Sequence, residues 1–201
     1  MQGSGIWRKF ELESRKMKLN KLKYFWIVLL VAGIGSVSLS SYKPAGDEIH
    51  WMSFDQAVAL CKTHPKKIFI DIYTQWCGWC KRMDASTYKD PAVVDYLNKN
   101  FYSVRLDAET KDTFHFKDHI FVNPHAGERG AVNELAYSLL DGKMMYPTTV
   151  YLDGDVNRLN VVPGYIETEE FKTLLKFFAE EKYKTMSYDD YKKSLTGGST
   201  K

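Results

Sequence analysis

The chain has 201 residues, of which 44% are hydrophobic and 14% aromatic, which suits one folded domain with a core and excludes a disordered chain. Its formal net charge of +3 is uneven, because seven basic and only two acidic residues lie within residues 1–40. The remainder is slightly acidic and lacks a basic stripe with interleaved aromatic residues, which excludes a nucleic-acid-binding surface of the usual kind. No fixed-period repeat is present, which argues against a solenoid or propeller.

The first segment has the order of an export signal. A cluster of lysines precedes the uncharged stretch YFWIVLLVAGIGSVSLSSY (24–42), and secretory signals place a basic region, an apolar stretch and small residues in this order. Ser38 and Ser40 are candidates for the small residues before a cleavage site at Ser41. The stretch is also nearly long enough to remain as a membrane anchor. Both interpretations place the folded domain outside the cytoplasm, where disulfide chemistry is possible.

Capping residues and periodicity predict a helix and then a strand at the start of the domain. Residues 43–50 form a polar lead-in, and Ser53 with Gln56 has the spacing of a capping box at a helix N-terminus. The segment KIFIDIYT (67–74) is rich in isoleucine and aromatic residues, which is typical of a central strand. The residues expected to form the buried stripe of the helix are Phe54, Ala57, Val58 and Cys61.

Helices and strands continue to alternate along the chain. A helix is expected from Cys77, and a second helix begins at Pro91, with Asp90 as its N-cap. The segment FYSVRLDA (101–108) is the next predicted strand. Residues 109–145 follow as an irregular insertion, in which TFHFKDHIFVN is a candidate hairpin.

Two more strands and two more helices are predicted after the insertion. The strands are YPTTVYLD (146–153) and LNVVPGYI (159–166). Thr168 is expected to cap a long final helix, and Ser187 with Asp190 indicates an added short one. This alternation with a late strand pair predicts an α/β fold in which helices flank a central mixed sheet.

The segment DIYTQWCGWCKRMD (71–84) holds two cysteines, Cys77 and Cys80, which suggests a metal site, a structural disulfide or redox chemistry. A structural zinc site needs four ligands, and the third cysteine of the chain, Cys61, is expected on a buried helix face. The histidines that remain as ligands are His115, His119 and His125. These lack ligand-like spacing, so no metal is expected.

A purely structural disulfide is disfavoured as well, because so small a loop removes little unfolded-state entropy.

Redox chemistry accounts for more of the residues around the pair. Cys77 is expected where a strand gives way to a helix, and the positive end of a helix favours thiolate over thiol. Cys80 lies one turn further on and can resolve a mixed disulfide formed by Cys77. Asp71 occupies a strand position where an apolar residue is expected, so burial should raise its pKa and allow it to accept the proton of Cys80. Trp79, beside the second cysteine, is a candidate aromatic residue for partner docking.

These residues resemble the active site of the thioredoxin superfamily. DIYTQWCGWCK has Trp76 before the pair, Lys81 after it and an aspartate six positions before the first cysteine. Pro147 in YPTTVYLD matches the cis-proline that thioredoxins carry before their fourth strand. Two further positions match, Gly164 to a glycine in the following strand and Arg105 to a buried lysine.

More narrowly, residues 68–101 are similar to the thioredoxin-like C-terminal domain of bacterial transmembrane thiol:disulfide interchange proteins. The shared features include the Asp-x-Tyr entry, the acidic residue Asp84 and the Thr-aromatic-x-Asp turn at 87–90. The resemblance covers roughly residues 50–182. It implies a thioredoxin fold with an insertion before the cis-proline strand.

The resemblance also implies an activity, which is the reduction of disulfides in extracytoplasmic proteins through the Cys-Gly-Trp-Cys dithiol, as a part of cell redox homeostasis. A transmembrane electron donor is the implied partner, and no cofactor is implied. The residues implied in substrate contact are Trp76, Trp79, Tyr146 and Pro147. Because Gly78 and Trp79 replace the usual Gly-Pro, a disulfide oxidase or isomerase on the same fold remains an alternative. A non-catalytic module that binds metal or a partner is another.

Three regions are expected along the chain. Residues 1–42 are the basic N-terminus with the signal or anchor, and residues 43–185 are the thioredoxin-like domain. Residues 186–201 are a C-terminal extension.

Overall fold

The computed structural model describes residues 48–196. The expected export signal and its cleavage site therefore lie outside the described residues. The elements are β1 (Trp51–Met52), α2 (Phe54–Cys61), β2 (Lys67–Tyr73), α3 (Gly78–Ala85), η1 (Thr87–Lys89), α4 (Pro91–Asn100), β3 (Phe101–Asp107), β4 (Phe114–Phe116), β5 (His119–Phe121), α5 (Glu134–Leu139), β6 (Thr148–Leu152), β7 (Arg158–Pro163), α6 (Thr168–Ala179), η2 (Lys182–Lys184) and α7 (Tyr188–Thr196).

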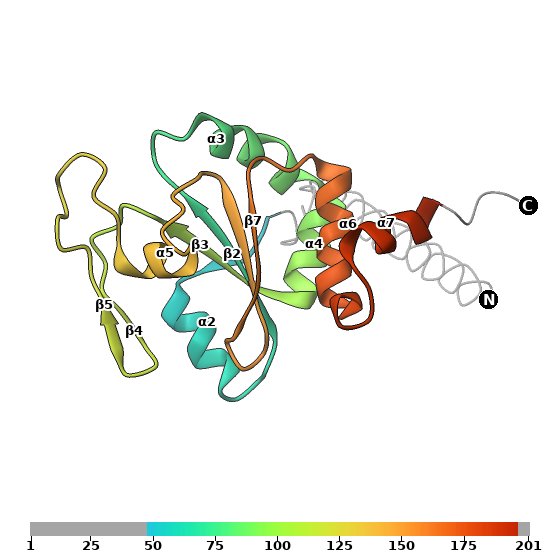
Figure 1. Cartoon of the computed structure of the whole chain (residues 1–201), viewed down its shortest axis with the longest axis horizontal. Helices are drawn as coiled ribbons and strands as arrows, with labels where there is room; N and C mark the ends of the chain where they lie inside the picture. The colour runs from blue at the N-terminus through green and yellow to red at the C-terminus, as the bar shows by residue number, and fades with distance from the viewer. Residues whose placement is uncertain (1–47, 197–201) are drawn as a thin grey trace, which may run out of the picture. The chain divides into compact units, whose positions relative to one another are not determined.

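A five-stranded mixed sheet in the order β1-β3-β2-β6-β7 forms the centre of the domain (Figure 1). Strands β1 and β2 run parallel to β3, whereas β6 runs antiparallel to β2 and to β7. Pairing of β2 with β3 extends from Lys67 opposite Phe101 to Tyr73 opposite Asp107. The predicted α/β fold with a mixed sheet is confirmed.

The sheet separates two hydrophobic clusters, because successive side chains of a strand point to opposite faces. On one face Ile68, Ile70 and Ile72 of β2 pack with residues of α2, α5 and the β4–β5 hairpin. On the other face Phe69 packs with residues of α3, α4, α6 and α7. A buried ring stack between Tyr151 and Phe178, with centroids 4.1 Å apart, joins β6 to α6 on this second face.

Side-chain caps fix the first helices of the domain. Ser53 and Gln56 form the predicted capping box at the start of α2, and the four residues predicted to form its buried stripe are buried. The Asp90 carboxylate accepts the backbone N–H groups of Ala92 and Val93, both at 3.0 Å, and Pro91 is the first residue of α4, as predicted.

The predicted cap of the long final helix is wrong by one position. Thr168 is the first residue of α6, and Glu167 is its N-cap. Glu167 has extended backbone angles, and its carbonyl accepts the Phe171 N–H at 2.8 Å, so the first turn closes one residue earlier than expected. The short helix predicted around Ser187 and Asp190 is confirmed as α7.

The insertion at 109–145 is more ordered than its sequence suggested. The candidate hairpin is present as the antiparallel pair β4–β5, and Phe116 lies edge-on to Phe54 of α2 with centroids 5.5 Å apart. The insertion also contains α5, a helix that was not predicted. Asn133 caps α5 and donates its side-chain amide to the Asp112 carbonyl at 2.9 Å, so it fixes the helix to the start of the insertion.

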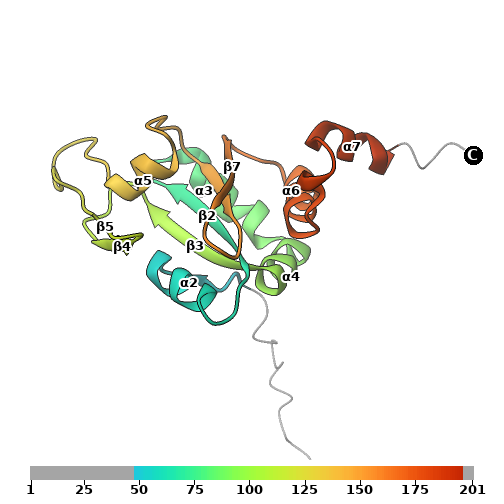
Figure 2. The same cartoon turned by 60° about the horizontal axis from the view of Figure 1, so that its bottom comes forward.

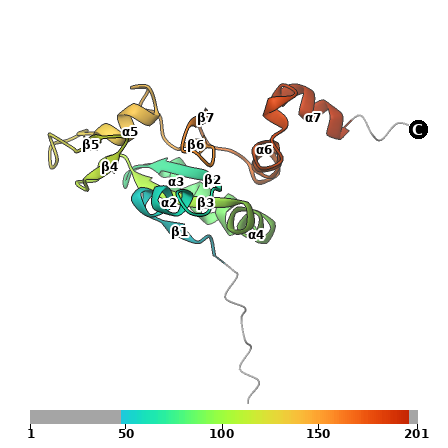
Figure 3. The ribbon, with the colours of Figure 1, turned by 90° about the horizontal axis from the view of Figure 1, so that it is seen from below.

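The hairpin and α7 lie at opposite ends of the described domain (Figures 2 and 3). Tyr191 of α7 is buried in the hydrophobic cluster on the second face of the sheet, together with residues of α6. None of the helices between residues 48 and 196 combines the length and hydropathy that a bilayer crossing requires.

Candidate active site

A disulfide joins Cys77 to Cys80 where β2 is followed by α3. Cys77 is the N-cap of α3, and its Sγ accepts the backbone N–H of Cys80 at 3.1 Å. Both residues are nearly buried, with 4% of Cys77 and 3% of Cys80 exposed. The N–H groups and the positive end of a helix stabilise a thiolate, so this position favours a reactive sulfur when the pair is reduced.

Hydrogen bonds hold the turn that carries the pair. The Cys77 N–H donates to the Thr74 carbonyl at 3.1 Å, which closes the turn between β2 and α3. The Gln75 side-chain amide donates to Asp107 Oδ2 at 2.9 Å and so fixes the turn to the end of β3. The cysteine pair is thus placed by two adjacent parallel strands.

Asp71 of β2 is buried, with 1% of the residue exposed. Burial raises its pKa from 3.8 to about 7, and the negative charge of Asp84 acts in the same direction. The Arg105 guanidinium and the Tyr88 hydroxyl oppose this rise. A carboxyl with a pKa near neutrality can both accept and release a proton at physiological pH.

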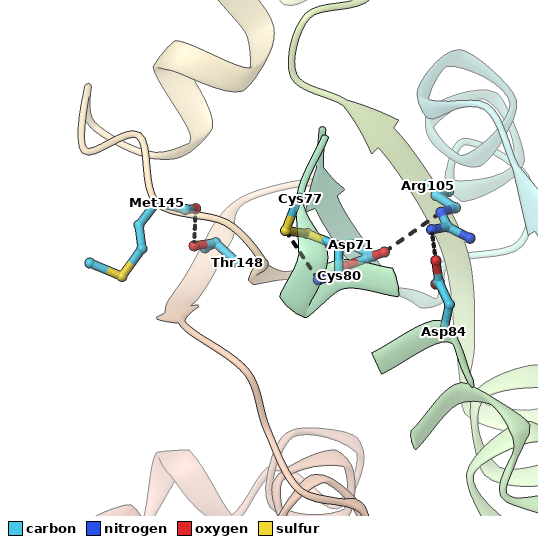
Figure 4. The surroundings of a disulfide bond; sticks show 7 residues. All are labelled: Asp71, Cys77, Cys80, Asp84, Arg105, Met145 and Thr148. Carbon is cyan, nitrogen blue, oxygen red and sulfur yellow. Dashed lines mark hydrogen bonds and ion pairs between the residues drawn. A yellow bond between two sulfur atoms is a disulfide. The ribbon is translucent and has the colours of Figure 1, made fainter. Parts of the chain in front are cut away.

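Arg105 of β3 links two acidic residues beside the pair (Figure 4). Its Nη2 lies 2.6 Å from Asp84 Oδ2, and its Nε lies 3.7 Å from Asp71 Oδ2. The guanidinium also lies over the Tyr73 ring, 4.4 Å from its centroid. The sequence marked these acidic and basic residues separately, but only the register of β2 against β3, which places Asp71 opposite Arg105, brings them together.

Trp76 forms one side of the site and is 65% exposed. Its indole N–H donates to Glu109 Oε1 at 3.0 Å, and its ring lies edge-on to Tyr146 with centroids 5.9 Å apart. Burial, Glu109 and Asp107 raise the pKa of Tyr146 to about 12. Both ends of the insertion therefore contact Trp76.

The Tyr146–Pro147 peptide bond is cis, as the resemblance implied, and Pro147 is buried. The Pro147 carbonyl accepts the N–H of Gly164 at 2.8 Å. Gly164 has a φ of +96°, which a side chain would disfavour, and it comes directly after β7 rather than within that strand. The neighbouring Thr148 hydroxyl donates to the Met145 carbonyl at 2.7 Å.

Trp79, which precedes the second cysteine, is 55% exposed. Its ring lies 5.4 Å from that of Tyr165, centroid to centroid, and Arg82 lies over both rings. Sequence reasoning singled out Trp79 but missed Arg82 and Tyr165. The signal for Arg82 is its helical spacing from Trp79, whereas nothing local to Tyr165 indicates the contact.

The third cysteine lies apart from this site. Cys61 is free and buried in the cluster with α2, as predicted, and its Sγ donates to the Lys66 carbonyl at 3.2 Å. Burial raises the pKa of its thiol. Among residues 48–196, no group of three or more histidine, cysteine or acidic residues has the arrangement of a metal site.

Comparison with known proteins identifies the family. Residues 36–182 match the family described as "Thioredox_DsbH: Protein of unknown function, DUF255". An uncharacterized protein of Archaeoglobus fulgidus is 25% identical over 46% of this chain and 72% of its own length. The thiol:disulfide interchange protein DsbD of Pseudoalteromonas atlantica is 29% identical over 34% of this chain, and the match spans only 12% of that protein.

A solved structure shares the fold. A thioredoxin-fold protein from Helicobacter pylori is 18% identical, with a TM-score of 0.52 over 78% of this chain and 92% of that one. A structure titled "DsbH Oxidoreductase" is 17% identical, with a TM-score of 0.49 over 71% of this chain and 92% of that one. The chain therefore belongs to the Thioredox_DsbH family, with a thioredoxin fold and, in the Cys77–Cys80 pair, the dithiol–disulfide chemistry of a thiol:disulfide oxidoreductase.

Proposed function

We propose that the protein is an exported oxidoreductase that reduces disulfides of extracytoplasmic proteins. The observation that carries this proposal is the Cys77–Cys80 disulfide at the N-terminus of α3, with the buried Asp71 on the strand that precedes it. This combination supplies a reactive sulfur, a resolving sulfur and a proton acceptor. The match to a thiol:disulfide interchange protein supports disulfide exchange as the reaction, and the reducing direction is part of the proposal.

In the proposed reaction the reduced Cys77 thiolate attacks one sulfur of a substrate disulfide. A mixed disulfide forms, and the other substrate sulfur leaves as a thiolate that takes a proton from water. Cys80 then loses its proton to Asp71 and attacks the Cys77 sulfur. The second substrate sulfur leaves as a thiolate and takes a proton from water, and Asp71 returns its proton to water. Two electrons have then passed to the substrate, and the protein is left with its own disulfide.

The pKa of Asp71 near 7 suits this role, because general acid–base catalysis is most efficient when the pKa of the group lies close to the working pH. Trp76, Trp79, Tyr146 and Pro147 are the residues proposed to contact the substrate. Their exposure supports this role, since both tryptophans are more than half exposed and each directly precedes one of the two cysteines.

Location and electron supply complete the proposal. Residues 1–42 act as a signal or an anchor, residues 43–185 form the redox domain, and residues 186–201 are an extension. A transmembrane reductase returns the pair to its dithiol state. Fusing residues 1–42 to a reporter that is active only outside the cytoplasm tests the first part, and an inactive reporter contradicts export.

Insulin reduction by the full-length protein, recycled by dithiothreitol, tests the activity. Cys77→Ser should abolish it, whereas Cys80→Ser should accumulate a mixed disulfide that is visible by mass spectrometry. Cys61→Ser is the matched control and should retain the activity. A Cys77→Ser protein that still accelerates insulin reduction contradicts the proposal.

The reduction potential of the Cys77–Cys80 pair tests the direction. Equilibration against glutathione or dithiothreitol should give a value close to that of thioredoxin, roughly −270 mV. A value close to the roughly −120 mV of a strong periplasmic oxidant would instead identify a protein that donates disulfides.

A further inference from the structure

The geometry points to a specificity device beside the redox pair: we propose that Trp79, Arg82 and Tyr165, here called the arginine cluster, bind an acidic side chain close to the reactive cysteine of a partner polypeptide. This inference rests on the proposed function and names the class of substrate. Trp79 separates the two cysteines in sequence, and Tyr165 follows Gly164, whose N–H donates to the Pro147 carbonyl. The arginine cluster therefore joins two segments that border the disulfide.

The aromatic rings hold the guanidinium in place. Arg82 Cζ lies 5.3 Å from the Trp79 ring centroid and 5.4 Å from that of Tyr165, and the two rings are inclined at 44°. An arginine over aromatic faces keeps its charge and leaves the N–H groups at its edge able to donate. The cluster thus presents a positioned cation rather than a freely rotating one.

Within residues 48–196, the Arg82 guanidinium forms no ion pair with a carboxylate. By contrast, Arg105 pairs with Asp84, and Arg158 pairs with Asp141. The nearby carboxylate of Glu167 lies 3.4 Å from the Tyr165 hydroxyl and forms no ion pair with Arg82. A guanidinium fork without a carboxylate is suited to bidentate binding of a carboxylate from outside.

The surroundings of Trp76 have the opposite charge to the arginine cluster. Glu109 accepts the Trp76 N–H, and Asp107 lies close enough to Tyr146 to raise the pKa of its hydroxyl. An acidic segment bound over the pair is therefore attracted by Arg82 and repelled by the carboxylates next to Trp76. Repulsion on one side gives discrimination as well as affinity. The Glu167 carboxylate, 3.4 Å from the Tyr165 hydroxyl, also disfavours an extended polyanion as the occupant.

Two synthetic peptides test the inference. Both contain the same disulfide-closed loop, flanked by two glutamates in one peptide and by two lysines in the other. The full-length protein should reduce the glutamate peptide about three- to tenfold faster at low salt, and the preference should decline as salt is added. Arg82→Glu should remove or invert the ratio, whereas Arg82→Lys, a point charge, should keep only part of it.

Arg129→Glu is the matched control, because Arg129 is an exposed arginine of the insertion and the change in charge is identical. This variant should leave the ratio unchanged. The ratio between peptides also cancels any effect of Arg82 on the reduction potential, because both peptides share the same protein dithiol. An Arg82→Glu protein that reduces both peptides with the wild-type ratio overturns the inference and leaves the proposed function intact.

Binding tests the surface without the chemistry. Peptides in which serine replaces both cysteines are titrated against the oxidised full-length protein by calorimetry. The glutamate peptide should bind several-fold more tightly than the lysine peptide, and Arg82→Glu should abolish the difference. Equal affinities of the wild type for the two peptides overturn the inference, whether or not the protein reduces insulin. A failure to reduce insulin contradicts the proposed function instead.

Discussion

The disulfide has two different surroundings. Towards the interior lies a charged group in which the partly buried Arg105 pairs with the partly buried Asp84 and lies near the buried Asp71. Towards solvent it is bordered by Trp76 and Trp79, each more than half exposed. The interior residues are placed by strand register and burial, whereas each of the outer tryptophans is held by a few contacts at the surface. This difference suggests that the interior sets the proton chemistry and the outer residues set the choice of partner.

The largest expected effect is on the free energy of unfolding, and it comes from the buried Asp71. A pKa of about 7 for Asp71 in place of 3.8 means that the folded protein favours the protonated carboxyl. That stabilisation is complete below pH 4 and is lost as the pH rises through 7, a difference of about 4 kcal/mol. Asp71→Asn should therefore unfold at higher denaturant concentration than the wild type at pH 8, and the two should converge at pH 4.

Asp95→Asn provides the control for this comparison, because Asp95 forms an exposed ion pair with Lys99. Exposed pairs contribute little to stability, so this variant should follow the wild type at both pH values. Equal unfolding midpoints for Asp71→Asn and the wild type at pH 8 would contradict the raised pKa.

Turnover should show the next largest effect. Removing the carboxyl of Asp71 removes the proposed acceptor of the Cys80 proton, so Asp71→Asn should lower the rate of insulin reduction by about 100-fold at pH 7. The loss should be equal for the glutamate and lysine peptides, since the change lies on the interior side. A loss of rate with only one of the two peptides would show that Asp71 also affects the choice of substrate.

Arg105→Met should have a smaller effect on the same side. The guanidinium lowers the pKa of Asp71, so its removal should raise that pKa by roughly one unit or more. The pH profile of activity should move to higher pH accordingly, and carbon-detected NMR of Asp71 should report the same change. Lys99→Met, which removes an exposed cation, is the matched control and should leave both measurements unchanged.

The smallest effect is expected at the surface. Trp76→Phe removes the hydrogen bond to Glu109 but keeps an aromatic ring next to Tyr146, so it should cost about 1 kcal/mol of unfolding free energy or less. Trp79→Phe loses no protein hydrogen bond among the described residues and should cost less still. Denaturant midpoints of the two variants decide this, and a larger loss for Trp79→Phe would contradict the assigned contacts.

Local signals were enough to predict most of the fold. Capping residues such as Ser53 and Asp90 and the composition of β2 identified the elements because these signals act within a few residues. Helix α5 was missed because its 6 residues are too few to show a periodic apolar pattern, although Asn133 caps it locally. Thr168 was taken for a cap because its residue type favours that position, although the helix closes its first turn from Glu167.

The site was predictable to the extent that it is local in sequence. The cysteine pair, its tryptophans and Asp71 lie within ten residues, so their roles could be proposed from spacing and from the family resemblance of this short segment. The contacts of Arg105 with Asp71 and of Arg82 with Tyr165 join distant segments. They depend on strand register and on side-chain direction, which a single sequence does not specify.

The hydrogen bonds that close the insertion where it joins the sheet indicate where the protein tolerates added residues. The Asn133 N–H donates to the Ala108 carbonyl at 2.8 Å, and its side-chain amide donates to the Asp112 carbonyl, so the loop is closed where it leaves the sheet. The β4–β5 hairpin lies beyond this closure. Its tip at Lys117 and Asp118 is therefore expected to accept an inserted label or peptide, while the site around the disulfide keeps its geometry.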